Sequence, residues 1–134
     1  MTAVVDSSIV VDVLLRWGRA NNATLALMPH SGDVHAPQLI LPETMSALRG
    51  IERGEKASRI QIARALRDAH RLPATLWALK PLTRRVWQLR HAISTYDAYY
   101  VALSEQLNAH LITADARLAR AVEAGGWCPV DLVV

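Results

Sequence analysis

Four acidic residues occupy positions where their carboxylates could act together on a metal ion: Asp6, Glu43, Asp97 and Asp115. Asp6 directly follows a short apolar run at 2–5, which predicts a buried strand. Asp115 follows a second such run, at 110–113, after one residue. In open parallel sheets the ligand crevice lies outside the carboxyl ends of the strands, so Asp6 and Asp115 should face the same edge.

The other two acids are expected in the first turns of helices. Asp97 belongs to the apolar helical pattern at 96–108, and Glu43 belongs to a helix entered through Pro42. A helix N-terminus favours a carboxylate through its free amides and its dipole, so Asp97 and Asp115 could simply cap helices. Asp6 could be a turn former at the end of a strand, and a Glu in a first turn, such as Glu43, is common. A shared site is therefore indicated by the four acids together and by none of them alone.

Four carboxylates at one edge repel one another strongly. At ~4 Å and an effective dielectric constant near 20, a single pair is unfavourable by ~4 kcal/mol, so a cation should offset the charge. Oxygen ligands without His or Cys suit Mg²⁺ or Mn²⁺ better than Zn²⁺. Such ions activate water and stabilise a phosphodiester during transfer, and the pattern therefore predicts a metal-dependent nuclease.

Short strands that alternate with helices predict a parallel sheet covered on both faces, an α/β fold in one domain spanning residues 1–134. Besides the strands already named, we expect strands at 34–36, 75–79 and 130–134. Helices are expected at 7–17, 22–28, 38–51, 55–70, 82–92, 96–108 and 116–124.

Composition points to a protein of the cytoplasm that does not enter a membrane. Hydrophobic residues make up 51% of the 134 residues, and no segment approaches the ~18 apolar residues of a membrane span. The N-terminal segment lacks a basic leader, so we expect no signal peptide. The single cysteine, Cys128, excludes an intrachain disulfide framework, and we expect it to be non-catalytic.

Positive charge is concentrated in the middle of the chain, within an overall formal charge of +3. From Arg49 to Arg90 there are eleven basic residues and three acidic ones. This segment suits a polyanionic partner such as nucleic acid, although a solvated, arginine-rich helix face explains it equally well.

The local sequences around the four acids resemble the PIN-domain nucleases, and most of all the VapC toxins of bacterial toxin–antitoxin pairs. The resemblance rests on four segments in the same order and spacing, and it covers essentially the whole chain: Val4 to Ser8, Ala36 to Arg49, Tyr96 to Leu103, and Leu111 to Ala119.

This resemblance implies a three-layer α/β/α fold and an endoribonuclease that depends on Mg²⁺ or Mn²⁺. It assigns Asp6, Glu43, Asp97 and Asp115 as the acidic quartet that binds metal and catalyses cleavage, with Ser8 and Thr113 in support. RNA would be the substrate, with transfer and ribosomal RNA as candidates, and the sequence does not show which RNA is cut. It also implies a VapB-like antitoxin that covers the site, a homodimer and a larger toxin–antitoxin assembly.

Several residues have two interpretations. Arg49 could hold RNA or balance the acidic charge. Arg90 and His91 could contact the scissile phosphate, or lie on the polar side of the helix at 82–92. Asp12 is expected at the surface or between helices. Likewise, the apolar faces of helices 38–51 and 55–70 fit either a protein contact or the core, and the four tryptophans fit the core or an interface.

Three other classes of protein compete with a ribonuclease. A phosphatase or phosphoreceiver on a similar sheet is disfavoured, because Ser8 replaces the second Asp that such sites need and no Lys follows Lys80. A binding module that keeps a metal site without catalysis stays open. A structure-specific DNA nuclease is disfavoured by the short chain, which has no added DNA-binding element.

Overall fold

A five-stranded parallel sheet forms the centre of the molecule in a computed structural model that describes all residues from 1 to 134. The strand order is β3-β2-β1-β4-β5, and every neighbouring pair is parallel. The strands are β1 (Ala3–Val5), β2 (Val34–Pro37), β3 (Thr75–Trp77), β4 (His110–Thr113) and β5 (Val130–Leu132). All five were predicted, and the parallel α/β class is confirmed.

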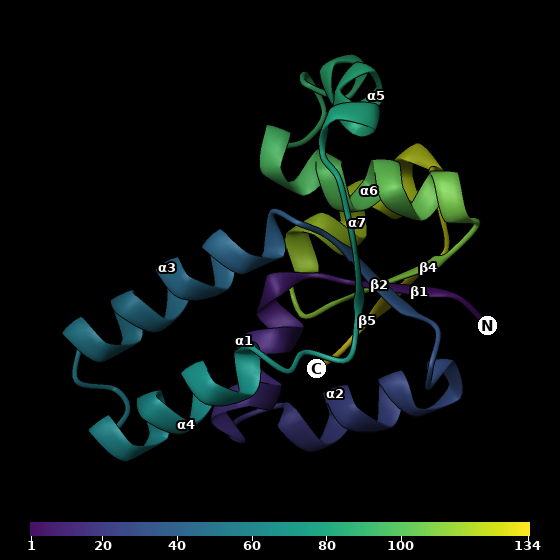
Figure 1. The fold of residues 1–134 in the computed structure, drawn as a ribbon. Helices are drawn as coiled ribbons and strands as arrows, with labels where there is room; N and C mark the ends of the chain where they lie inside the picture. Colours follow the sequence, from purple (N-terminus) through teal and green to yellow (C-terminus); the bar gives the residue numbers. More distant parts are fainter.

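Helices cover both faces of this sheet (Figure 1). α6 contacts β1, β2 and β4, and α7 contacts β4 and β5, whereas α1 packs with α2, α3 and α4. The helices are α1 (Ser7–Leu15), α2 (Ala20–Leu27), α3 (Ile40–Arg53), α4 (Arg59–Ala69), α5 (Thr83–Gln88), α6 (Thr95–Leu107) and α7 (Ala116–Gly125). The three-layer arrangement expected from the resemblance is therefore present.

The core explains why the two strands that carry acids are so apolar. All three residues of β1 are buried, and Leu111 and Ile112 of β4 are fully inaccessible. Tyr100, Val101 and Leu103 bury the middle of α6 against the sheet. Because β1 and β4 are neighbours in register, the residues that follow them emerge at one edge.

Some element boundaries differ from the prediction for local reasons. α1 ends at Leu15 because Arg16 adopts a left-handed conformation with a φ of 58°. α4 begins only at Arg59, where Ser58 and Gln61 form a reciprocal capping box. The helix predicted at 82–92 stops at Gln88, so Arg90 and His91 lie in the connection to α6 and not on a helix face.

Two side chains also differ from what the sequence suggested. Trp87 is 63% exposed, so it is not a core residue. Asp12 is buried and pairs with Arg19 at the start of α2 at 2.9 Å, so the interhelical interpretation is right and the surface one is wrong.

None of the helices combines the length and the apolarity that crossing a membrane requires.

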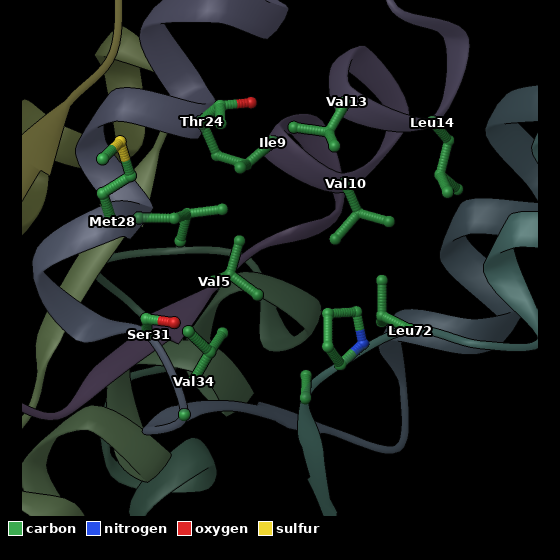
Figure 2. A pocket seen from close by; sticks show the side chains of 14 residues that line it. Val5, Ile9, Val10, Val13, Leu14, Thr24, Met28, Ser31, Val34 and Leu72 are labelled. Carbon is green, nitrogen blue, oxygen red and sulfur yellow. The ribbon is translucent and has the colours of Figure 1, made fainter.

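An apolar pocket of about 400 Å³ lies between α1, α2 and β2 (Figure 2). Its walls include Val5 of β1, Ile9 and Val10 of α1, Met28 directly after α2, and Leu72 from the segment between α4 and β3. No residue that lines it is ionisable. This pocket therefore cannot perform acid–base or metal chemistry, and the acids lie elsewhere.

Candidate active site

Asp6 leaves β1 and caps α1, which explains why an acid occupies this point. Its Oδ1 accepts the backbone N–H groups of Ser8 at 3.1 Å and of Ile9 at 3.3 Å. The residue is only 6% exposed, so a largely desolvated carboxylate stands at the carboxyl end of the sheet.

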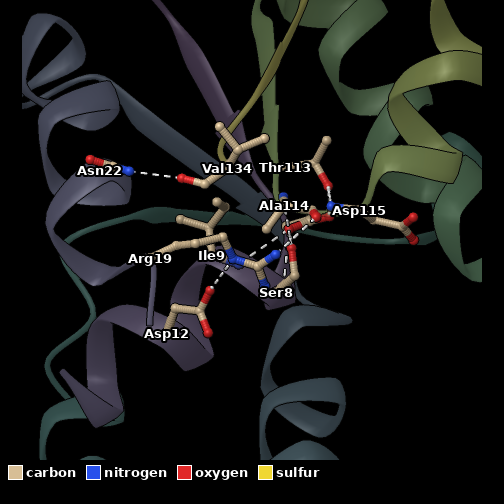
Figure 3. A network of polar contacts seen from close by, with 10 residues as sticks. Ser8, Ile9, Asp12, Arg19, Asn22, Thr113, Ala114, Asp115 and Val134 are labelled. Carbon is tan, nitrogen blue, oxygen red and sulfur yellow. Dashed lines mark hydrogen bonds and ion pairs between the residues drawn. The ribbon is translucent and has the colours of Figure 1, made fainter. Parts of the chain in front are cut away.

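Two hydroxyl groups fix the orientation of the Asp6 carboxylate. Ser8 Oγ donates to Oδ1 at 2.5 Å, and Thr113 Oγ1 donates to Oδ2 at 2.5 Å. The same hydroxyls accept backbone N–H groups from the loop after β4, from Ala114 to Ser8 at 3.1 Å and from Asp115 to Thr113 at 3.0 Å (Figure 3). Ser8 and Thr113 thus bind the β1 and β4 ends of the site together.

Asp115 is the N-cap of α7 and has the same local role as Asp6. Its Oδ1 accepts the N–H groups of Arg117 at 2.9 Å and Leu118 at 3.2 Å. Behind this loop, Arg19 donates to Asp12 at 2.9 Å and reaches the Ala114 carbonyl at 3.4 Å (Figure 3). The loop that carries Asp115 is therefore held from both sides.

Glu43 reaches the site from α3, because Tyr100 of α6 donates its hydroxyl hydrogen to Glu43 Oε1. Tyr100 was predicted to be a buried helix residue, and its link to Glu43 was not foreseen. The available signal was its position three residues after Asp97, which places both on one face of α6. Burial and the Glu43 carboxylate raise the pKa of this tyrosine far above its ordinary range, so it remains a hydrogen-bond donor.

Asp97 is the acid whose charge interacts with the charges of all three others. It sits in the first turn of α6, where Ser94 caps the helix by accepting the Asp97 N–H at 3.1 Å. Burial raises the pKa of Asp97, and the charge of Asp115 raises it further. The charge of Asp97 in turn raises the pKa values of Asp6 and Glu43, after burial as the larger cause in both.

The donor set fits a hard divalent cation. The pKa of Asp6 rises to about 6, and those of Glu43 and Asp97 rise as well. None of the four acids forms an ion pair within the chain, and the only basic group that lowers the pKa of one of them through its charge is Arg117, which acts on Asp97. Desolvated carboxylates without a full counter-charge are costly, and an oxygen-binding cation relieves that cost.

The four carboxylates do not converge on one point in this conformation. No group of three or more His, Cys, Asp or Glu side chains is arranged to enclose an ion. Asp6 and Asp115 turn oxygens toward the helices that they cap, and Glu43 turns one toward Tyr100. Hydrogen bonds thus reduce the repulsion that a cation would otherwise offset.

The three basic candidates from the sequence lie in different places. Arg49 is exposed on α3, six residues beyond Glu43, and has no polar contact with the acids. Arg90 and His91 line a cleft that also contains Asp97. Arg117 lines the same cleft from α7 and was missed, because sequence alone does not bring α7 beside the α5–α6 connection.

Comparison with known proteins agrees with this geometry. The PIN domain family matches residues 3–124. Ribonuclease VapC9 of Mycobacterium tuberculosis is 36% identical over 130 residues, which cover 97% of each chain. The chain therefore belongs to the PIN-domain family, and within it to the VapC ribonucleases. This membership excludes the phosphatase and phosphoreceiver alternative.

Solved structures share the fold at low sequence identity. The structure of VapBC2 from Rickettsia felis, bound to a promoter DNA fragment, superposes with a TM-score of 0.70 at 14% identity and covers all of both chains. A toxin–antitoxin complex from Klebsiella pneumoniae gives a TM-score of 0.61 at 19% identity and covers 85% of this chain and 87% of that one. These likenesses support the PIN-like architecture.

Proposed function

We propose that this chain is the toxin of a toxin–antitoxin pair and cleaves RNA as a metal-dependent endoribonuclease. The observation that carries the proposal is that four acids without an ion pair, from the end of β1, α3, α6 and the β4–α7 loop, lie near one another in a chain that belongs to the VapC ribonucleases. A binding module that keeps only a metal site would need the same acids, and the relatives that are named ribonucleases favour catalysis over that alternative.

Asp6, Glu43, Asp97 and Asp115 would hold Mg²⁺ or Mn²⁺. When bound, such an ion polarises the phosphodiester and generates a nucleophilic hydroxide from water. Ser8 and Thr113 keep both oxygens of Asp6 in one orientation. Tyr100 fixes Glu43 through Oε1, which leaves Oε2 of Glu43 for the site. We expect products with a 5′-phosphate and a 3′-hydroxyl.

We also propose a VapB-like antitoxin and a homodimer, with action in the cytoplasm. The Klebsiella complex described above is named as a toxin–antitoxin complex, which supports the first point. Much of the apolar face of α3 and α4 is core, for example Leu48 and Ile62, but Leu41, Ile60 and Leu66 are 40%, 79% and 38% exposed. These exposed side chains are available for a protein contact.

Mapping RNA ends after brief induction of the chain in bacteria tests the proposed function. We expect new 5′-phosphate ends at a small set of sites in transfer or ribosomal RNA, and none with Asp6→Asn. Asp131→Asn, an exposed acid that pairs with His110, is the matched control and should cleave like the unaltered chain. Identical sets of RNA ends from the unaltered chain and from the Asp6→Asn variant would reject the mechanism.

A further inference from the structure

A polar cleft of about 530 Å³ opens beside Asp97, between the α5–α6 connection and α7. Its polar walls are Arg90 and His91 on one side and Arg117 on the other, and Ile93 and Leu118 add apolar surface. The volume lies within the range of small-ligand sites, roughly 300–1,000 Å³. The cleft therefore has room for a group of about the size of a nucleotide.

The basic side chains of this cleft are available to bind an anion. Arg90, His91 and Arg117 form no ion pair, and the charge of Arg117 lowers the pKa of Asp97 without a hydrogen bond between the two side chains. The nearby Arg85, in contrast, is bound to Glu105 through two hydrogen bonds of 2.8 and 3.0 Å. Because Arg85 is already neutralised and Arg84 lies outside the cleft, the unpaired basic side chains beside Asp97 are those that line the cleft.

Arg90 is also held in position. Its guanidinium carbon lies 4.4 Å from the centre of the Trp87 ring, and its Nη1 donates to the Trp87 carbonyl at 2.8 Å. An arginine ordered in this way loses less conformational freedom when it binds a phosphate, and its planar face suits a nucleotide base. The exposed Trp87 thus gains a function as the support of Arg90.

The opposite side of the acidic cluster differs. A second hollow, beside Glu43, is lined by Ser7, Ser46 and Tyr96 with apolar neighbours and contains no basic residue. Of these two hollows, the one at Asp97 is therefore the one suited to a phosphate.

We infer that the cleft beside Asp97 is a substrate subsite that holds the RNA nucleotide next to the scissile bond. Arg90 and Arg117 bind its phosphate oxygens, and the apolar surface of Ile93 and Leu118 contacts its base or ribose. The phosphate concerned is the neighbour of the scissile one, because the scissile phosphate must lie at the carboxylates. This inference rests on the proposed function and specifies where the substrate lies.

Binding of a fluorescein-labelled, mixed-sequence single-stranded RNA to the Asp6→Asn chain, followed by anisotropy across a salt series, tests the subsite without cleavage. Arg90→Gln and Arg117→Gln should each weaken binding roughly 3- to 10-fold and lower the slope of log affinity against log salt by about 0.7 to 1. Arg84→Gln on α5 and Arg120→Gln on α7 are matched controls: both are exposed, lack an ion pair and lie outside the cleft. The controls should bind within about twofold of the parent chain.

Affinities of Arg90→Gln and Arg117→Gln equal to those of the controls would overturn the subsite. Polyglutamate can be added as a competing polyanion. Displacement of RNA by polyglutamate in the controls, but not in these two variants, would support the subsite, because both polyanions would then bind in the cleft. In the cleavage-competent chain, Arg90→Gln should raise KM with little change in kcat, because Arg90 does not touch the carboxylates. If the unaltered chain cleaves RNA but these variants behave like the controls, the subsite alone is wrong. If the unaltered chain does not cleave RNA, the proposed function is wrong and the subsite with it.

Discussion

Asp6 is the most buried of the four acids, and its environment opposes its charge. Burial raises the pKa of Asp6 from 3.8 to about 6, and the charge of Asp97 adds to this rise against the hydrogen bonds from Ser8, Thr113 and Ile9. A carboxylate with a raised pKa binds its proton more tightly in the folded state than in the unfolded state. The free energy of unfolding is therefore higher at low pH, where Asp6 is protonated. This contribution of Asp6 is lost as the pH rises through its folded-state pKa.

We predict that the metal-free protein loses stability between about pH 4 and pH 6, by about 3 kcal/mol from Asp6 alone. Urea unfolding in the presence of a chelator, across this range, measures the loss. In Asp6→Asn the decline should be much shallower, and at neutral pH this variant should be more stable than the parent. Identical pH profiles for the two chains would show that Asp6 is not the desolvated acid described above.

Thr113 is fully buried, and its hydroxyl connects the Asp6 carboxylate to the backbone N–H of Asp115. Replacement by Val keeps the shape but removes the donor to Asp6 and the acceptor for the Asp115 N–H. We expect Thr113→Val to lower cleavage about 10- to 100-fold, as is usual for groups that orient metal ligands. Thr113→Ser should restore most of the activity in a steady-state assay, and a Ser variant as weak as Val would argue against the hydroxyl.

At the scale of elements, Arg19 connects the start of α2 to the loop that carries Asp115. It pairs with the buried Asp12 at 2.9 Å and reaches the Ala114 carbonyl at 3.4 Å. Arg19→Gln should lower the free energy of unfolding by about 1–3 kcal/mol. This is less than for a fully buried pair, because Arg19 is partly exposed.

A double-mutant cycle with Asp12→Asn separates the ion pair from other effects of the two changes. Denaturant unfolding of the single and double variants should give a coupling energy of at least about 0.5 kcal/mol. Strict additivity would mean that the pair does not stabilise the connection between α2 and the loop.

The strands and the apolar helix α6 could be predicted from the sequence because their signals are local. Runs such as 2–5 and 110–113 are buried on both faces, and the spacing in 96–108 marks the buried side of a helix. The edge position of Asp6 and Asp115 followed from these strands, and their parallel direction is confirmed. Glu43 was placed in the first turn of a helix, but its assignment to the site depended mostly on the resemblance, because no local pattern places α3 beside α6.

Contacts between distant elements could not be predicted. Tyr100 and Glu43 are 57 residues apart, and Arg117 lines the same cleft as Arg90 only because α7 lies beside the α5–α6 connection. The end of α5 at Gln88 was also missed, since the pattern at 82–92 continues to look helical while the chain turns toward the Ser94 cap. Tertiary packing decides these features, and a single sequence carries little record of it.

At the scale of the whole molecule, the four acids should link metal binding to stability. An ion that binds only the folded state at a hundredfold excess over its Kd adds about 2.7 kcal/mol. We therefore expect Mn²⁺ to raise the melting temperature of the chain and to have no such effect on Asp97→Asn. Calorimetry with and without a chelator measures this shift, and an equal shift in both chains would place the ion elsewhere.

The most direct test of a shared carboxylate site is the rate of RNA cleavage by the purified chain as a function of Mn²⁺ concentration. The unaltered chain and Asp131→Asn should show the same saturable dependence and no cleavage in a chelator. Asp97→Asn should retain its fold and its RNA binding but show no cleavage at any Mn²⁺ concentration. Cleavage by Asp97→Asn with an unchanged Mn²⁺ dependence would contradict the assignment of the four acids to one catalytic metal site.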